Sequence, residues 1–341
     1  MTQQLPEGHP QVRQGKIGVL LVNLGTPDGP DPASVRRYLK EFLSDRRVIE
    51  LSPLLWQPIL RGVILPTRPR RSAEAYAKIW DHERNESPLR AITRQQAEEL
   101  SAWFATRHEQ VVLDWAMRYG SPSIAEKLGT LSEAGCRRLL VMPLYPQYSA
   151  ATTASVCDEV FAQLARRRWQ PALRTLPPYH DEPAYIAALA DSLRRAFSEE
   201  GEPEVLLASF HGMPRETLDK GDPYHCHCQK TGRLLREALG WNPERLRVTF
   251  QSRFGPKEWL RPYSDATVKQ LAGEGVKRIA MISPGFSADC LETLEEAAIG
   301  LRESFLESGG ERFTYVPCLN AGETHIALLA KLAERELRGW L

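Results

Sequence analysis

Residues 17–25 read IGVLLVNLG, an almost unbroken apolar run that ends in glycine. A run of this length is typical of a strand that is buried on both faces of a parallel sheet. Asp31 and Pro32 follow and supply a helix cap and a proline suited to the first turn, so we predict a helix over residues 33–43. The stretch therefore predicts a buried strand followed by a covering helix, the repeating unit of an α/β fold.

The same alternation continues along the chain. We predict strands at 111–117, 139–143, 205–210, 248–251, 278–283 and 313–316, and helices at 123–133, 154–167, 183–197, 265–272, 288–307 and 325–337. Such alternation favours parallel sheets that are covered by helices on both faces. We expect an α/β fold of two doubly wound, Rossmann-like halves, with a cleft where loops at the carboxyl ends of the strands meet.

The length and a proline-rich stretch near residues 176–181 suggest where the halves divide. We expect an N-terminal α/β domain at 1–176 and a C-terminal α/β domain at 177–322. A closing helix at 323–341 could pack back on the N-terminal domain.

The composition is that of an ordinary globular protein, with 42% hydrophobic and 26% charged residues. Lys and Arg number 44 against 43 Asp and Glu, so no basic excess points to nucleic acid. The six cysteines are scattered and do not form a disulfide framework. Residues 1–16 lack the pattern of a signal peptide, and no stretch has the roughly 18–20 apolar residues of a membrane span. We expect a cytoplasmic protein with reduced thiols.

Two predicted strands end in residues that could carry chemistry. His211 lies in SFHGMP at 209–214, where Gly212 and Pro214 would turn the chain and leave the imidazole facing the cleft. Glu292 and Glu296 lie in SPGFSADCLETLEE at 283–296, four residues apart on one helix face. The alternative for His211 is a structural histidine. The alternative for the carboxylates is the general preference of acidic side chains for helix N-termini.

The run His225-Cys226-His227-Cys228 invites a zinc or iron–sulfur interpretation. Paired metal ligands are usually separated by two or more residues, and no second cysteine pair follows at a suitable distance. We therefore favour a solvent-exposed loop over a metal site.

Six motifs in order carry a resemblance to a known family. They are LLVNLGTPDGP at 20–30, YPQYSAATTAS at 145–155, SFHGMP at 209–214, GDPY at 221–224, FQSRFGPKEWL at 250–260 and PGFSADCLETLEE at 284–296. Together they resemble the ferrochelatases of proteobacterial type. These lyases insert Fe²⁺ into protoporphyrin IX to form protohaem, the terminal step of haem biosynthesis, with release of two protons.

The resemblance implies that the porphyrin is clamped between the two halves. His211 and Glu292 match the family's active-site histidine and glutamate, which are also its assigned iron ligands, and Glu296 matches an acidic position one turn further along. Some members continue this acidic row, but Ile299 and Gly300 interrupt it here. Fe²⁺ is then a substrate, and we expect no tightly bound cofactor. A C-terminal [2Fe–2S] cluster is not expected either, because no cysteine follows Cys318.

Other residues are candidates for holding the porphyrin. Tyr119, Tyr148, Trp259 and Phe286 would form aromatic walls, with core packing as the alternative, and Arg118, Arg46 and Ser149 would bind the propionates. Residues 54–65, which include Trp56, are unusually apolar for a surface segment. They would form a lip over the cleft and could rest on the inner membrane, unless they are simply buried.

Several alternatives stay open at this point. A coproporphyrin ferrochelatase, a cobalt-type chelatase and a non-catalytic porphyrin or haem carrier would share much of this pattern. Iron could arrive past His211 or from the opposite face of the ring. The expected partners are protoporphyrin IX and Fe²⁺, in a monomer or weak homodimer that binds no nucleic acid.

Overall fold

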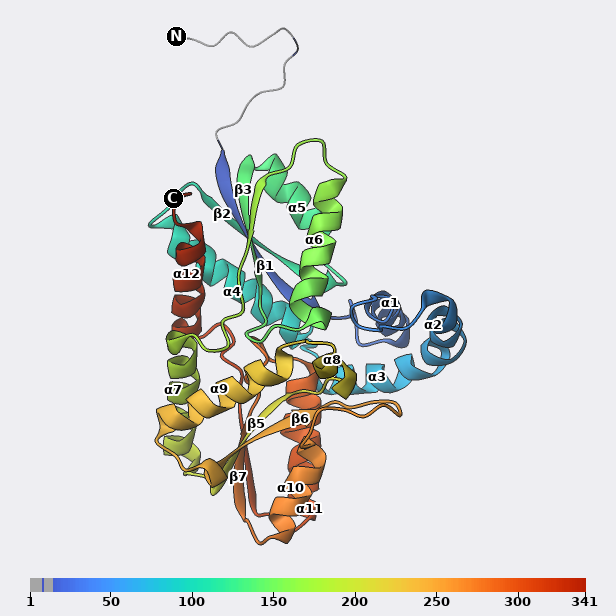
Figure 1. Cartoon of the computed structure of the whole chain (residues 1–341), viewed down its shortest axis with the longest axis vertical. Helices are drawn as coiled ribbons and strands as arrows, with labels where there is room; N and C mark the ends of the chain where they lie inside the picture. Colours follow the sequence, from blue (N-terminus) through green and yellow to red (C-terminus); the bar gives the residue numbers. More distant parts are fainter. Residues whose placement is uncertain (1–7, 9–14) are drawn as a thin grey trace.

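The computed structural model describes residue 8 and residues 15–341, and it contains two parallel sheets of four strands (Figure 1). The first has the order β2-β1-β3-β4 and the second the order β6-β5-β7-β8. The strands are β1 (Lys16–Gly25), β2 (Val111–Tyr119), β3 (Cys136–Pro143), β4 (Ala172–Thr175), β5 (Val205–His211), β6 (Leu246–Gln251), β7 (Arg278–Ile282) and β8 (Arg312–Val316). The predicted fold of two doubly wound α/β halves is confirmed.

Helices connect the strands within each half. They are α1 (Pro32–Phe42), α2 (Pro53–Ile59), η1 (Leu60–Ile64), α3 (Leu65–Ile79), α4 (Pro88–Ala105), α5 (Ile124–Glu133), η2 (Ala150–Ala154), α6 (Ser155–Ala165), α7 (Pro183–Glu200), α8 (Arg215–Asp219), α9 (Tyr224–Leu239), η3 (Pro243–Arg245), α10 (Ser264–Gly273), η4 (Glu292–Leu301), α11 (Arg302–Glu307) and α12 (Glu323–Leu337). The segments η1, η2 and η4 are π-helical. No helix in the described part of the chain is long and apolar enough to cross a membrane.

The strand β1 shows why the opening apolar run decides the fold. Alternate side chains of a strand point to opposite faces of the sheet. Val19 and Leu21 pack with α4 and α12 in one cluster, whereas Leu20 and Val22 pack with α5 and α6 in another. Both faces are therefore covered, and α1 follows with Asp31 accepting hydrogen bonds from two backbone N–H groups of its first turn.

The helix α12 lies beside the first sheet, although it is the last helix of the chain (Figure 1). It packs against α4, α7 and β3. The cluster that contains Val19 and Leu21 also includes Leu329 of α12 and Phe210 of the second sheet. One apolar core is thus shared by the N-terminal and C-terminal sheets, on the face of the first sheet that α12 covers.

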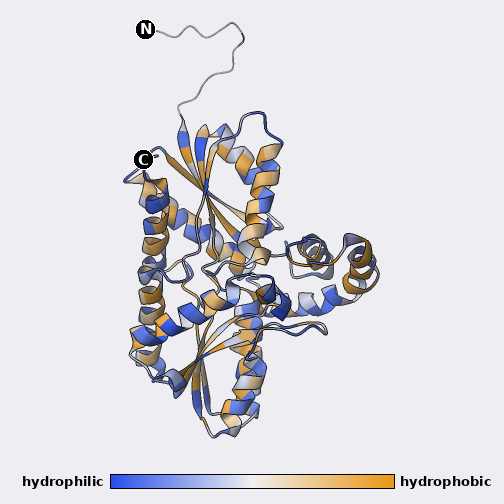
Figure 2. Cartoon of the chain, viewed as in Figure 1, coloured by the Kyte–Doolittle hydropathy of each residue, from blue (hydrophilic) through white to orange (hydrophobic). Residues whose placement is uncertain are grey.

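The helices α1, α2 and α3 form an arm at the side of the two sheets (Figure 1). Apolar residues gather on α2 at the far end of this arm (Figure 2). Leu54 and Leu55 are 88% and 68% exposed there, while the indole of Trp56 turns inward and donates a hydrogen bond to the Leu43 carbonyl at 2.6 Å.

Two expectations about the elements were wrong. The run at 225–228 lies in the first turns of α9, with Cys228 fully buried, because Asp222 and Pro223 start a helix there. The Asp222 carboxylate accepts a hydrogen bond from the Tyr224 N–H at 3.0 Å. The helix expected from residue 288 begins at Glu292, and its first ten residues are π-helical.

Candidate active site

A cavity of about 650 Å³ lies at the carboxyl ends of the strands of both sheets. This volume is in the usual range for a site that takes one organic ligand. Its walls include Leu24 near the end of β1, Leu144 after β3, His211 at the end of β5 and Phe286 after β7. The loops that the sequence predicts around one cleft therefore do meet there.

His211 enters this cleft from the last position of β5. Its Nδ1 lies 2.7 Å from the carbonyl oxygen of Gly212. Because a carbonyl oxygen only accepts, Nδ1 is the donor in this hydrogen bond, and Nε2 is the ring nitrogen left for another partner. The turn after His211 needs glycine, since a Cβ at Gly212 would lie 2.7 Å from the Gln251 carbonyl oxygen.

Glu292 begins the π-helical segment η4 and lines the same cleft. Its carboxylate accepts a hydrogen bond from the Cys290 thiol, with Sγ and Oε2 3.0 Å apart. Its backbone carbonyl accepts a hydrogen bond of 2.7 Å from the side-chain amide of Gln251. Glu292 is thus held through its backbone by β6 and through its carboxylate by the segment just before η4.

Gln251 links the two candidate catalytic residues. Its carbonyl accepts from the Gly212 N–H at 2.7 Å, and its side-chain oxygen accepts from the Ser209 hydroxyl at 2.7 Å. The same side chain holds the first residue of η4 through its amide. Gln251 is a positioning residue that the sequence did not single out, although it lies within the motif at 250–260.

Glu296 lies one turn further along η4, outside the cleft lining. The pKa of its carboxyl is raised to about 7, first by burial and then by the charge of Glu292, although a hydrogen bond from the Ser252 hydroxyl lowers it. Glu295 points elsewhere, because its carboxylate pairs with Lys78 at 2.7 Å. Of the three acidic residues in the first turns of η4, Glu292 is therefore the one that lines the cleft.

Three of the predicted porphyrin-binding residues line the cleft, namely Ser149, Trp259 and Phe286. Trp259 is 5% exposed, and its indole N–H donates to the Phe254 carbonyl at 3.0 Å, so the ring is fixed in place. Tyr148 is absent from the lining. Its backbone N–H donates instead to Nδ1 of His227, at 3.2 Å.

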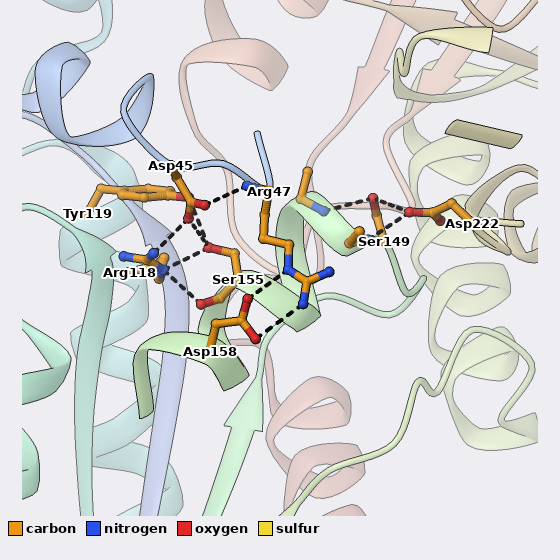
Figure 3. Close-up of polar contacts among 10 residues, drawn as sticks. Asp45, Arg47, Arg118, Tyr119, Ser149, Ser155, Asp158 and Asp222 are labelled. Carbon is orange, nitrogen blue, oxygen red and sulfur yellow. Dashed lines mark hydrogen bonds and ion pairs between the residues drawn. The ribbon is translucent and has the colours of Figure 1, made fainter. Parts of the chain in front are cut away.

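Arg118 and Tyr119 lie away from the cleft, in the polar network of Figure 3. The Arg118 guanidinium contacts the Asp45 carboxylate at 2.6 Å and the Ser155 hydroxyl at 2.7 Å. The Tyr119 hydroxyl donates to the same carboxylate at 2.8 Å. These side chains serve to fix the segment after α1, and we leave them out of the proposed site.

Cations that the sequence did not single out stand at the cleft instead. Arg47, Arg68 and Lys257 line it, whereas Arg46 does not. Arg47 pairs with Asp158 at 2.7 Å, as Figure 3 shows, and Lys257 pairs with Glu216 at 2.5 Å. Arg47 directly follows Arg46 in the sequence. The pair of arginines indicates a cation near the cleft, but not which of the two lines it.

Solved structures with a similar fold include SirB and a protein that is structurally similar to chelatases. The chain aligns with "SirB from Bacillus subtilis with Fe3+" at a TM-score of 0.54 and 11% identity, covering 94% of this chain and 95% of that one. DR2241 from Deinococcus radiodurans, a multi-domain protein with structural similarity to chelatases, gives a TM-score of 0.53 at 12% identity, covering 94% and 55%. At such identities the likeness defines a class of fold, the chelatase-like α/β proteins.

Comparison of the sequence identifies the family within this class of fold. The family model described as Ferrochelatase matches residues 16–337. Curated ferrochelatases are 61% identical over 334 residues in Rhizobium meliloti (strain 1021), covering 98% of both chains, and 57% identical over 338 residues in Agrobacterium fabrum, covering 99% of this chain and 98% of that one. The chain belongs to the ferrochelatase family, and the family predicted from its motifs is confirmed. It is accordingly an enzyme of the lyase class.

Proposed function

We propose that this chain inserts Fe²⁺ into protoporphyrin IX to form protohaem. The observation that carries the proposal is a single apolar cleft, of a size for one large ligand, into which His211 and Glu292 both project. In the reaction Fe²⁺ replaces two pyrrole protons, so two protons leave and no electron is transferred. The site needs a base and an anionic group beside the ring, and these two residues supply them.

His211 is the base in this proposal. Its Nδ1–H is committed to the Gly212 carbonyl, which leaves the Nε2 lone pair available to a pyrrole N–H. An imidazole can accept a proton and release it again, which suits a general base. Glu292 balances the charge of the incoming ion.

His211 and Glu292 are also the proposed transient ligands of Fe²⁺. Imidazole and carboxylate together suit a borderline divalent ion, and they would also accept Zn²⁺ or Co²⁺. In residue 8 and residues 15–341 no group of three or more His, Cys, Asp or Glu side chains is placed to hold a metal ion. The porphyrin nitrogens would complete the ligand set. Glu296, whose pKa lies near 7, can take up a proton leaving the site.

The walls and the mouth of the cleft fit the two parts of a porphyrin. Trp259 and Phe286 present fixed apolar surface to the ring, and contacts along its edges can hold it puckered toward the geometry of metal entry. Ser149, Arg47 and Lys257 are the proposed partners of the propionates. Each of these cations would exchange its present carboxylate partner for a propionate.

We also propose that α2 touches a membrane surface from the cytoplasmic side. Leu54, Leu55, Ile59 and Val63 are exposed at 88%, 68%, 43% and 56%, and they lie beside cleft-lining residues such as Trp56 and Ile64. An apolar patch at the mouth of a site for a poorly soluble ligand fits a surface from which that ligand arrives.

Anaerobic turnover with two porphyrins tests the proposed reaction. We expect Fe²⁺ or Zn²⁺ to enter protoporphyrin IX rapidly, with repeated turnovers followed by the Soret and visible bands. Faster metallation of coproporphyrin III would assign the chain to coproporphyrin ferrochelatases instead. Binding of one porphyrin per chain without metallation would identify a carrier and overturn the proposal.

A further inference from the structure

A second and much smaller cavity lies behind Glu292. Its walls include Thr26 after β1, Tyr38 of α1 and Tyr76 of α3. Glu292 lines both this cavity and the porphyrin cleft, as do Leu24, Leu89 and Cys290. These four residues therefore lie between the two spaces, whereas Thr26, Tyr38 and Tyr76 line only the smaller one.

Thr26 supplies a buried hydroxyl with no direct partner. The residue is 1% exposed, and its Oγ1 makes no hydrogen bond to any group in the described part of the chain. A buried hydroxyl in that state costs roughly 1–3 kcal/mol unless water satisfies it. The backbone of Thr26 lies close to that of Gly120, because a Cβ on Gly120 would lie 2.6 Å from the Thr26 carbonyl oxygen.

Tyr38 and Tyr76 add two phenol groups beside Thr26. Both are 7% exposed, and the hydroxyl groups of Thr26 and Tyr38 lie close to that of Tyr76. Burial raises the pKa of both phenols well above the usual range, and the charge of Glu292 adds to the effect. Both therefore stay protonated and can donate a hydrogen bond. Ring contacts with Phe42 and Trp80 limit their movement.

The size of this cavity limits what it can take. Its volume is about 10 Å³, which is close to the least that accommodates one water molecule and too little for two. A buried water needs two to four polar partners. Thr26, Tyr38, Tyr76 and the Glu292 carboxylate supply that number.

We propose that this cavity binds one water molecule, held by the hydroxyl groups of Thr26, Tyr38 and Tyr76, which hydrogen-bonds to the Glu292 carboxylate and orients it toward the cleft. The Cys290 thiol holds one carboxylate oxygen on its own side. The water supplies a second contact and so fixes the rotation of the group. Thr26, Tyr38 and Tyr76 are then positioning residues for a metal ligand, and this last step rests on the proposed function.

Crystal structures at high resolution test the water without reference to activity. In the parent protein we expect one ordered water about 2.5–3.0 Å from Thr26 Oγ1 and within hydrogen-bond distance of the Glu292 carboxylate. In Thr26→Val, which keeps the shape of the side chain and removes the hydroxyl, we expect the water to be lost. A cavity without ordered water in the parent would overturn the proposal even if the enzyme were fully active.

Steady-state kinetics with Zn²⁺ and protoporphyrin test the positioning role. Outer partners of metal ligands typically contribute 10–100-fold. We expect Thr26→Val and Tyr76→Phe to raise KM for the metal about 10-fold with KM for the porphyrin unchanged, and Thr26→Ser to restore the parent value. Tyr179→Phe is the matched control. Tyr179 is also a buried tyrosine, its hydroxyl has no partner among the described residues, and it lines neither cavity.

An unchanged KM for the metal in both variants would contradict the positioning role. So would an equal rise in KM for the porphyrin, which would indicate a general disturbance of the cleft. A parent protein that binds the water but metallates no porphyrin would contradict the proposed function and leave the water site standing.

Discussion

At the end of β5, a hydrogen bond to one backbone carbonyl fixes which nitrogen of the His211 imidazole is the donor. The Gly212 carbonyl oxygen accepts a hydrogen bond from Nδ1 of His211. Nε2 is then the ring nitrogen that can contact a ligand in the cleft. Gln251 then couples this turn to Glu292, because its backbone contacts one and its side chain the other. Two residues far apart in the sequence thus share a support on β6.

Glu296 gives a pH-dependent prediction for stability. Its pKa is raised, chiefly by burial, from 4.5 to about 7. Between these values the folded chain holds a proton that the unfolded chain has lost, so this carboxyl makes the protein less stable as the pH rises. At about 1.4 kcal/mol per pH unit, the effect is on the order of 3 kcal/mol.

The variant Glu296→Gln removes this titration. We expect its denaturation midpoint to rise relative to the parent as the pH goes from 5 to 8, measured in urea at each pH. Glu303→Gln, at an exposed position of α11, is the control and should show no such trend. Parallel midpoints for Glu296→Gln and the parent across this range would show that Glu296 titrates normally.

Part of the cleft lining was predicted from the sequence motifs at and after strand ends. His211, Trp259, Phe286 and Ser149 do line the cleft. Arg118 also ends a strand, but its partner Asp45 comes from the segment after α1, and no local pattern predicts that long-range pair. The roles of Gln251 and Arg47 likewise depend on contacts that only the folded chain brings together.

At the scale of elements, the close approach of α9 to the second sheet depends on one glycine. A Cβ at Gly232 would lie 2.3 Å from a methyl group of Val248 on β6. We expect Gly232→Ala to destabilise the protein by about 1–3 kcal/mol, because α9 would have to move away from the sheet. Chemical denaturation measures the change.

The matched control for this prediction is Gly129→Ala. Gly129 lies inside α5, and a Cβ there meets nothing within 4 Å. Alanine should therefore leave stability unchanged or raise it by up to about 1 kcal/mol. If both variants lost the same stability, close packing of α9 would not be the cause.

The tip of the arm gives a prediction about membranes. We expect the parent protein to float with phosphatidylethanolamine–phosphatidylglycerol vesicles, and the double variant Leu54→Ser, Leu55→Ser to remain in the soluble fraction. Phe161→Ser is the control, since Phe161 is 50% exposed on α6, away from the lip. Absence of the parent from the lipid fraction would refute the membrane contact.

Local patterns predicted most strands and helices, but not their finer form. The apolar runs predicted the bounds of β1, β5 and β7 well. The π-helical turns of η4 were not predicted, because their residue pattern is also compatible with an α-helix. The His and Cys residues at 225–228 are compatible with a loop or a helix, and Asp222 and Pro223 start the helix.

At the scale of the whole molecule, the two sheets lie on either side of one cleft. Each sheet is parallel, so its loops gather at one edge, and the two edges face the same cavity. The alternation of strands and helices predicted this arrangement. The strand orders and the contact of α12 with α4 depend on long-range packing, and they became visible only in the folded structure.

The central claim is that metal enters the porphyrin between His211 and Glu292. Anaerobic insertion of Fe²⁺ into protoporphyrin IX by His211→Ala and Glu292→Gln, with porphyrin binding followed in parallel by fluorescence quenching, tests it most directly. We predict that both variants bind porphyrin with affinity close to the parent's and lose at least about 100-fold in kcat, as expected for loss of a proton-transfer group or a metal ligand. Full turnover by either variant would contradict the role assigned to that residue, and full turnover by both would place the chemistry outside this site.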